Sequence, residues 1–212
     1  MISKFKNVFV LAPHTDDGEF GAGGTIARLI EAGANVFYLA FSTAEASVPD
    51  GFAKDILKTE VIDATTILGI PKDNVRIFNY EVRKLNFVRQ EILENLILMR
   101  KEITPDLVLI PSLHDIHQDH ATVAQEGLRA FKNTTILGYE LIWNNLTFDT
   151  TSFVALEEHH VYAKIRALEA YRSQFGKNYL SKEFILSLAK VRGVQSNFNY
   201  AESFEVVRLM IK

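Results

Sequence analysis

The sequence contains no cysteine among its 212 residues. Disulfide bonds and thiolate metal sites are therefore excluded, and a metal would have to be held by nitrogen and oxygen ligands. A strong charge of either sign is also missing, because 23 basic residues stand against 26 acidic ones and the net charge is −3. Nucleic acids and anionic membrane surfaces are therefore not expected as partners.

Long hydrophobic runs are missing too. The apolar run near the N-terminus covers only six residues before polar groups intervene, which is too short for a signal peptide core or a membrane span. We therefore expect a cytoplasmic protein that does not contact a membrane. Linkers, repeats and low-complexity stretches are absent as well, and 48% hydrophobic composition over this length fits a single domain covering residues 1–212.

Short runs of β-branched and aromatic residues alternate with helical patterns along most of the chain. The predicted strands are 7–12, 35–42, 75–79, 106–112 and 134–142. The predicted helices are 23–32, 53–68, 86–103 and 120–131. This alternation predicts an α/β fold with a Rossmann-like, doubly wound and mostly parallel sheet, covered by helices on both faces. Beyond residue 150 we expect an apolar segment at 152–158, helices near 160–174 and 181–192, and a run at 203–211 that fits an extra strand.

Two polar segments follow the first and fourth predicted strands. They are APHTDDGEFGAGGTI at 12–26 and PSLHDIHQDHATV at 111–123. Ligands of doubly wound folds bind at the carboxyl ends of the strands, where the strand order reverses. If the first and fourth strands are neighbours, both segments meet in one crevice, and the loops 43–52, 79–87 and 143–151 are expected to form its walls.

A phosphate-binding loop is the first alternative for the segment at 12–26. Its glycines come after His14, Asp16 and Asp17, whereas the dinucleotide fingerprint requires glycines directly after the strand, and the GxxxxGK pattern is absent. Two carboxylates would also repel a phosphate. We therefore reject phosphate binding and expect the glycines to allow a tight turn into the next helix.

A metal site fits the same residues better. Zinc binds imidazole nitrogen and carboxylate oxygen, and a catalytic zinc site keeps three protein ligands and leaves one position for water. His14 and Asp17, with one histidine of the second segment, supply such a set. An adjacent aspartate, Asp16 or Asp17, is then left to take a proton from that water.

The two segments resemble motifs of a known family. HTDDGEFGAGG followed by HQDH is similar to the HPDDE motif, its glycine cluster and the later HPDH motif of the PIG-L or LmbE-like zinc-dependent N-acetylglucosaminyl deacetylases. KTEVIDATTILGI at 58–70, YRSQ and YAESFEVVR also resemble family patterns, so the similarity extends along most of the chain. The resemblance implies a hydrolase that releases acetate from an N-acetylated amino sugar and leaves a free amine.

The resemblance also implies roles for individual residues in this mechanism. His14, Asp17 and His120 would bind one zinc ion, or another divalent metal, per chain. Asp16 would be the general base.

His117 would stabilise the oxyanion and protonate the leaving amine, and Asp119 would orient a neighbouring imidazole. The partner would be a small amino-sugar substrate. Assembly into trimers or hexamers, which is common in the family, would be expected.

The chain departs from the family pattern at four positions. Thr15 and Gln118 replace prolines, with little expected effect. Gly18 stands where the family has glutamate, and the glutamate at 19 is shifted by one residue, so its side chain is expected to point elsewhere. Leu57 stands where the family commonly has an arginine, three residues before a glutamate, so substrate recognition is expected to differ.

Several site residues have alternative roles. Asp16 or Asp17 could be a helix N-cap. His117 could support the site without contacting the substrate, His120 could be a surface residue, and His114 could be a rival ligand. Asp115 could be a solvated loop residue or could orient a histidine.

Outside the motifs, Trp143 could stack on a sugar ring, although burial in the core or in an interface is the favoured interpretation. The other candidates are grips for an anionic group on the substrate, namely Arg83, Lys84 and Arg89. His159 and His160 have no acidic partner at ligand spacing and are treated as structural, and Glu202 has no role that the sequence reveals.

Two alternatives to an N-deacetylase stay open. One is a zinc hydrolase of the same fold that acts on another amide, N-acyl or ester bond. The other is a metal-binding or sugar-binding protein without catalytic activity.

Overall fold

The structure, a computed structural model, describes residues 2–211. These residues form one seven-stranded sheet in the order β3-β2-β1-β4-β5-β7-β6. Its strands are β1 (Asn7–His14), β2 (Asn35–Ser42), β3 (Val75–Ile77), β4 (Leu107–Pro111), β5 (Thr135–Tyr139), β6 (Ser152–Leu156) and β7 (Tyr200–Arg208). The α-helices are α1 (Asp17–Glu31), α2 (Ile56–Leu68), α3 (Arg89–Glu102), α4 (Gln118–Ala130), α5 (Glu158–Glu169) and α6 (Lys182–Ser196). The predicted α/β class is therefore confirmed.

The strand order places the two polar segments at one edge of the sheet. Strands β1 to β5 are parallel, and the chain runs from β1 to β2 and β3 on one side before β4 and β5 form on the other. Consequently β1 and β4 are neighbours, with Val8 opposite Leu107. Only β7 runs against its neighbours β5 and β6. The segments that follow β1 and β4 therefore meet at the switch point, as predicted.

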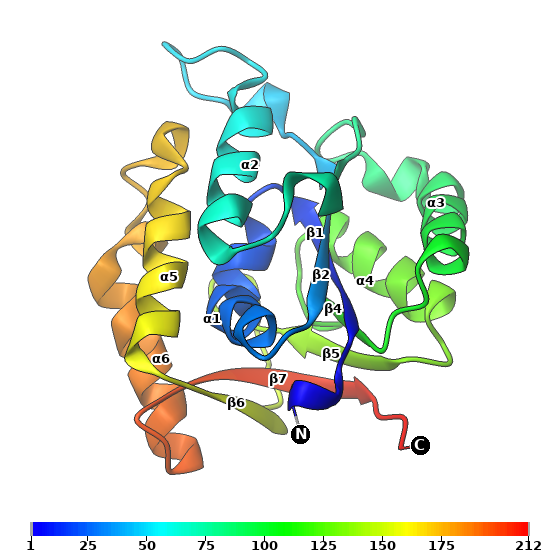
Figure 1. The fold of residues 1–212 in the computed structure, drawn as a ribbon. Coiled ribbons are helices and arrows are strands. Elements are labelled where there is room, and N and C mark those ends of the chain that lie inside the picture. The colour runs from blue at the N-terminus through cyan, green and yellow to red at the C-terminus, as the bar shows by residue number, and fades with distance from the viewer. Residues whose placement is uncertain (1, 212) are drawn as a thin grey trace.

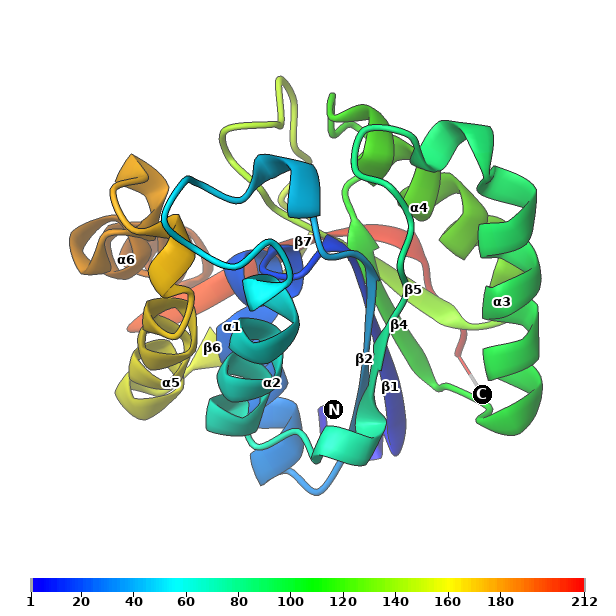
Figure 2. The ribbon, with the colours of Figure 1, turned by 90° about the horizontal axis from the view of Figure 1, so that it is seen from above.

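Helices cover both faces of the sheet (Figure 1). Along β1, Val8 and Val10 pack with the layer of α1, α2, α5 and α6, while Phe9 and Leu11 pack with the layer of α3 and α4. Figure 2 shows the two layers from above, with the sheet between them. Because both faces are buried, β1 is apolar at every inner position rather than alternating with polar residues.

Helix α1 begins at Asp17, six residues before the predicted start at 23, so four glycines lie within the helix. The prediction that these glycines serve a turn is therefore wrong. A Cβ at Gly18 would lie 2.6 Å from Cε2 of Tyr38, and one at Gly21 would overlap the ring of Tyr139. The glycines let α1 lie directly against aromatic rings of β2 and β5.

The same helix contains a kink at Ala22, where φ is −144°. Past the kink, the backbone N–H groups of Gly24 and Thr25 donate to the Glu202 carboxylate at 3.0 and 2.6 Å. The ammonium group of Lys164 lies 2.8 Å from the same carboxylate. Glu202 therefore caps the second part of α1, a role that the sequence did not reveal.

Local signals end and begin other helices. Gly69 ends α2 with a φ of +95°, in the left-handed region that favours glycine. Ser181 begins α6 by accepting a hydrogen bond from the backbone of Phe184 at 3.1 Å. The last strand was predicted at 203–211, but the observed strand β7 spans Tyr200–Arg208 and so begins and ends three residues earlier. Within residues 2–211, none of the helices is both long and apolar enough to cross a membrane.

Candidate metal centre

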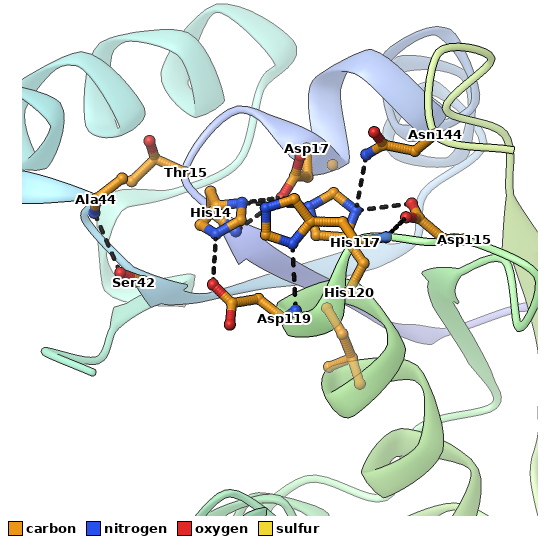
Figure 3. Close-up of polar contacts among 12 residues, drawn as sticks. His14, Thr15, Asp17, Ser42, Ala44, Asp115, His117, Asp119, His120 and Asn144 are labelled. Carbon is orange, nitrogen blue, oxygen red and sulfur yellow. Dashed lines mark hydrogen bonds and ion pairs between the residues drawn. The ribbon is translucent and has the colours of Figure 1, made fainter. Parts of the chain in front are cut away.

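Three side chains from three elements converge at the switch point (Figure 3). His14 is the last residue of β1, Asp17 is the first residue of α1, and His120 lies in the first turn of α4. Nδ1 of His14 lies 3.1 Å from Oδ2 of Asp17 and 3.2 Å from Nε2 of His120. The remaining separation, between Nε2 of His120 and Oδ2 of Asp17, is 3.2 Å. The three atoms thus form a nearly equilateral triangle.

The size of this triangle fits zinc. A tetrahedral ion with ligands at roughly 2.0–2.1 Å separates those ligands by about 3.3–3.4 Å. All three side chains are largely buried, with exposed fractions of 13% for His14, 8% for Asp17 and 3% for His120. The nitrogen and oxygen donors, their spacing and their burial therefore suit a divalent metal.

Two further carboxylates fix the orientation of the imidazole rings. Nε2 of His14 lies 3.1 Å from Oδ2 of Asp119, and Nδ1 of His120 lies 2.7 Å from Oδ2 of Asp115. A carboxylate accepts a hydrogen bond, so each of these outer nitrogens carries the proton. The inner nitrogen of each ring is then left with its lone pair facing the centre of the triangle, as a metal ligand requires.

The carboxylates also shape the charge of the centre. Burial lowers the pKa of His14, but Asp17 and Asp119 outweigh it and raise that pKa to about 9. Burial likewise lowers the pKa of His120, but Asp17 and Asp115 raise it to about 10. Burial raises the pKa of Asp17, whereas His120 and His14 hold it well below its usual range. At neutral pH each ring therefore also binds a proton at its inner nitrogen, and a metal ion would displace that proton to reach the lone pair.

His117 differs from the other two histidines of the cluster. Its ring stacks on that of His120 with centroids 4.5 Å apart, and its nearest nitrogen lies within 4.8 Å of theirs. However, Nδ1 of His117 accepts the backbone N–H of Asp119 at 3.2 Å. Burial, followed by the charges of His120 and His14, lowers the pKa of His117, so the ring is neutral and carries its proton on Nε2. His117 therefore offers an N–H donor rather than a lone pair.

Asp16 is the residue before α1, but its side chain caps no backbone group there. The helix-cap alternative for Asp16 is therefore not what the structure shows. The side chain lines the pocket instead, and burial together with the charge of Asp17 raises its pKa. Asp17, by contrast, does bond to the nearby backbone: its Oδ2 accepts a hydrogen bond from the backbone N–H of His14 at 2.7 Å.

The centre lies in a cavity of about 310 Å³. Three expected loops supply part of its wall, through Ser47, Arg83 and Trp143, and a fourth stretch adds Lys177 and Tyr179. The indole of Trp143 stacks on Tyr179 with centroids 4.1 Å apart and is 36% exposed. Of the two favoured interpretations, burial of Trp143 in the core is therefore wrong, and burial in an interface stays a prediction.

Other candidates lie apart from the centre. His114 is exposed and does not belong to the nitrogen cluster. Lys84 pairs with Glu81 at 2.7 Å, and Nε of Arg89 lies 2.7 Å from a carboxylate oxygen of the buried Glu126. These two cations are therefore engaged elsewhere.

Glu19 lies beneath the segment 14–17, not in the pocket. Its carboxyl oxygens lie within hydrogen-bond distance of the hydroxyl groups of Tyr38 and Tyr171, the latter at 2.9 Å. The same hydroxyls lie 2.8 and 2.6 Å from the carbonyl oxygen of Thr15. Burial raises the pKa of Glu19 to about 8, so the group is mostly a neutral acid at pH 7. The shifted glutamate thus supports the segment, and Tyr38 fills the space beside Gly18.

Glu60 supports a different wall of the pocket. Its carboxylate accepts the backbone N–H of Ser173 at 2.9 Å and the hydroxyl of the same residue at 2.6 Å. This pairing fixes the stretch that carries Gln174 into the pocket. Leu57, one helical turn before Glu60, gives an apolar side chain to the pocket wall where the family commonly has an arginine.

A second histidine cluster lies at the other end of α1. Glu31 lies 3.1 Å from Nε2 of His159 and 2.7 Å from Nε2 of His160, so the acidic partner that the sequence lacked comes from far along the chain. Nδ1 of His160 accepts the backbone N–H of Glu157 at 3.0 Å. Nε2 of the neutral His160 ring therefore carries the proton and donates to Glu31. This cluster caps α5 and offers no inward lone pair at His160.

Comparisons with known proteins identify relatives of this chain. The family described as GlcNAc-PI de-N-acetylase, PIG-L, matches residues 9–131. The diacetylchitobiose deacetylase of Thermococcus kodakarensis is 26% identical over 227 residues, which cover 95% of this chain and 83% of the relative.

Solved structures show the same fold. The N,N′-diacetylchitobiose deacetylase of Pyrococcus horikoshii superposes with a TM-score of 0.79 at 22% identity, covering 96% of this chain and 84% of that one. GalB, the 4-carboxy-2-hydroxymuconate hydratase of Pseudomonas putida KT2440, gives 0.76 at 22% identity and covers 98% of both chains. The fold therefore occurs with more than one reaction, and the site must decide the chemistry.

Proposed function

The chain belongs to the PIG-L family of GlcNAc-PI de-N-acetylases, and we propose that it hydrolyses the N-acetyl group of an N-acetylglucosamine-type sugar or conjugate. The observation that carries the proposal is the triangle of His14, Asp17 and His120 beside Asp16, a carboxylate without a structural partner at the helix start. The deacetylase names of the relatives support it.

We further propose zinc as the metal, held by His14, Asp17 and His120. A divalent metal at this position supplies Lewis-acid chemistry, since it polarises a carbonyl and lowers the pKa of bound water to near 7. Asp119 and Asp115 keep the inward lone pairs of the two imidazoles available, as described above. The proposal of zinc over another divalent metal rests on the size of the triangle and on its mixed nitrogen and oxygen donors.

The chain's own groups divide the proton transfers between them. Asp16 is the base that takes a proton from the attacking water, because its carboxylate faces the pocket and its raised pKa favours proton uptake. The N–H of His117 donates to the oxygen of the acyl group as negative charge develops there. The proton that Asp16 has taken from the water is then passed to the nitrogen as the C–N bond breaks, which yields acetate and a free amine.

The test is a screen for acetate release by the zinc-loaded protein. N-acetylglucosamine, N,N′-diacetylchitobiose and phosphorylated or carboxylated N-acetylated amino sugars form the panel, with chelated protein and zinc-reloaded protein as controls. We expect acetate and free amine in equal amounts from at least one sugar, with loss on chelation and recovery on reloading.

Two other outcomes would contradict the proposal. Hydrolysis of a longer acyl group or an ester, without acetate release, would favour a hydrolase of different specificity. Tight zinc binding with no turnover of any substrate would favour a metal-binding or sugar-binding protein. The expected trimeric or hexameric assembly and the cytoplasmic location stay predictions.

A further inference from the structure

Two cationic side chains line the pocket without a direct contact to a carboxylate of the described residues. Arg83, from the loop after β3, and Lys177, from the stretch between α5 and α6, both belong to the pocket wall. Among residues 2–211, neither side chain forms a direct ion pair, and the only carboxylate that either charge acts on is Asp16 of the same pocket, whose pKa is raised by burial and lowered in part by the charge of Lys177. Their neighbours behave differently, because Lys84 pairs with Glu81 and Arg89 pairs with Glu126. The two unpaired cations are therefore the ones that face the substrate pocket.

The backbone of Arg83 is held in an unusual conformation. Its φ is +66°, in the left-handed region that residues other than glycine rarely adopt. Its N–H donates to Oδ2 of Asp119 at 2.6 Å, and its carbonyl accepts a hydrogen bond from the amide of Gln118. Asp119 also contacts the imidazole of His14. One carboxylate therefore fixes both the backbone of Arg83 and an imidazole of the proposed metal site. Such strain is typical of functional positions.

The guanidinium group of Arg83 keeps most of its donors free. One of its terminal nitrogens donates to the hydroxyl of Ser47, another pocket residue, at 2.9 Å. Because a guanidinium carries five N–H groups, the others remain available for a ligand, in the planar arrangement that suits two oxygens of a carboxylate or phosphate. Arg83 is therefore positioned as an anion grip at a fixed place relative to the metal centre.

The second cation lies beside an aromatic wall. Nζ of Lys177 lies 5.6 Å from the ring centroid of Tyr179, which stacks on Trp143. Phe20 meets the indole of Trp143 edge to face at 5.2 Å, and all three aromatic residues line the pocket. An apolar sugar face can pack on this wall while a charged substituent contacts the ammonium group.

We propose that the substrate is an N-acetylated amino sugar that carries an anionic oxygen group, a carboxylate or a phosphate, bound by Arg83 and Lys177. This inference rests on the proposed deacetylase function and adds the chemical class of its substrate. Two unpaired cations favour an anionic group over sugar hydroxyls, which need no charge compensation.

The kinetic test compares charged and neutral sugars on the zinc-loaded full-length chain. The anionic probes are N-acetylglucosamine 6-phosphate, N-acetylglucosamine 1-phosphate and N-acetylmuramic acid, and the neutral probes are N-acetylglucosamine and N,N′-diacetylchitobiose. We expect kcat/KM for the best anionic probe to exceed that for either neutral probe by about tenfold or more. The phosphate and carboxylate probes separate the two anionic groups.

Variants assign the preference to the two cations. Arg83→Gln is expected to lower the ratio of anionic to neutral kcat/KM by roughly 10–100-fold, and Lys177→Gln by a smaller factor, because arginine binds in a bidentate manner. Lys84→Gln is the matched control. It removes a positive charge from the residue next to Arg83, but the side chain of Lys84 does not line the pocket. It should leave the ratio unchanged.

A binding measurement keeps the inference independent of turnover. By calorimetry, glucosamine 6-phosphate should bind the zinc-loaded protein more tightly than glucosamine, and Arg83→Gln should remove that difference. The inference is overturned if neutral sugars are equally good substrates and ligands, or if Arg83→Gln and Lys84→Gln shift the ratio alike. Absence of acetate release from every sugar would instead contradict the proposed function, while the calorimetric result would still decide the inference.

Discussion

The two ends of helix α1 each bring a carboxylate to two histidines, but the first cluster is largely buried whereas Glu31 and His159 of the second are exposed, and the ring nitrogens have different partners. At the start of the helix, Asp17 meets His14 and His120, whose outer nitrogens face the carboxylates of Asp119 and Asp115. At its end, Glu31 meets His159 and His160 at comparable distances. Composition and spacing alone do not distinguish these clusters.

The difference lies in what the second nitrogen of each ring does. An outer carboxylate accepts a hydrogen bond from the N–H of the outer nitrogen and so leaves a lone pair on the inner nitrogen, which suits a metal. At His160 the second nitrogen accepts a backbone N–H, so the inner nitrogen carries the proton and makes a hydrogen bond to Glu31. The partner of the outer nitrogen therefore indicates whether a cluster of histidines and carboxylates is a metal site or a structural ion pair.

Removing one imidazole from each cluster should give the largest contrast in zinc affinity between the two clusters. His120→Ala removes an inward lone pair, and its loss of zinc affinity should exceed the roughly 10–100-fold typical of an outer partner. His159→Ala removes an exposed ring and should leave zinc stoichiometry and affinity unchanged. Equilibrium dialysis with zinc measures both, and a comparable loss in the two variants would place a second metal site at Glu31.

Changing the outer carboxylate tests the orientation argument itself. Asp115→Asn keeps the shape of the side chain but weakens its acceptance of the His120 proton, so zinc affinity should fall by about 10–100-fold. Glu31→Gln is the counterpart at the other cluster and should not change zinc affinity. Competition with a chromogenic chelator gives both values, and unchanged affinity in Asp115→Asn would show that this carboxylate does not orient a ligand.

The smallest effect is expected on stability, at the second cluster. His160→Ala removes the acceptor at the start of α5 and should lower the free energy of unfolding by about 1 kcal/mol. Burial, partly opposed by Glu31, lowers the pKa of His160 below its ordinary 6.5. The unfolded chain then binds more protons, so the contribution of the native ring is lost as the pH falls through about 6.5.

Urea denaturation between pH 5 and pH 8 checks this expectation. The difference between the unmodified chain and His160→Ala should shrink toward the acid side. His159→Ala, an exposed control, should stay within about 0.5 kcal/mol at every pH. A difference that grows in acid would mean that His160 is protonated in the folded state.

Local patterns predicted the sheet and the place of the site. Buried parallel strands are continuous apolar runs, so β1 and β4 stand out, and the polar segments behind them mark the crevice. The start of α1 was missed because glycines are read as breaks in a helix. Only the packed structure shows that rings of Tyr38 and Tyr139 occupy the space beside Gly18 and Gly21.

The sequence also could not reveal contacts between residues that lie far apart along the chain, because only the packed structure brings them together. Glu31 and His160 are 129 positions apart, and no local spacing connects them. The cap that Glu202 provides for α1 spans a greater separation still, 178 positions to Gly24. The histidines that we propose as metal ligands could be nominated from the sequence only because a short segment carried several candidate ligands together.

The most direct test of the account is a paired measurement on Asp16→Asn. The account makes Asp16 the base and not a ligand, so the variant should bind zinc with the stoichiometry and affinity of the unmodified chain. Acetate release should fall by roughly 10²–10⁴-fold, because the proton of the attacking water loses its acceptor. Unchanged turnover, or loss of zinc together with turnover, would contradict the assignment of base and ligands at this centre.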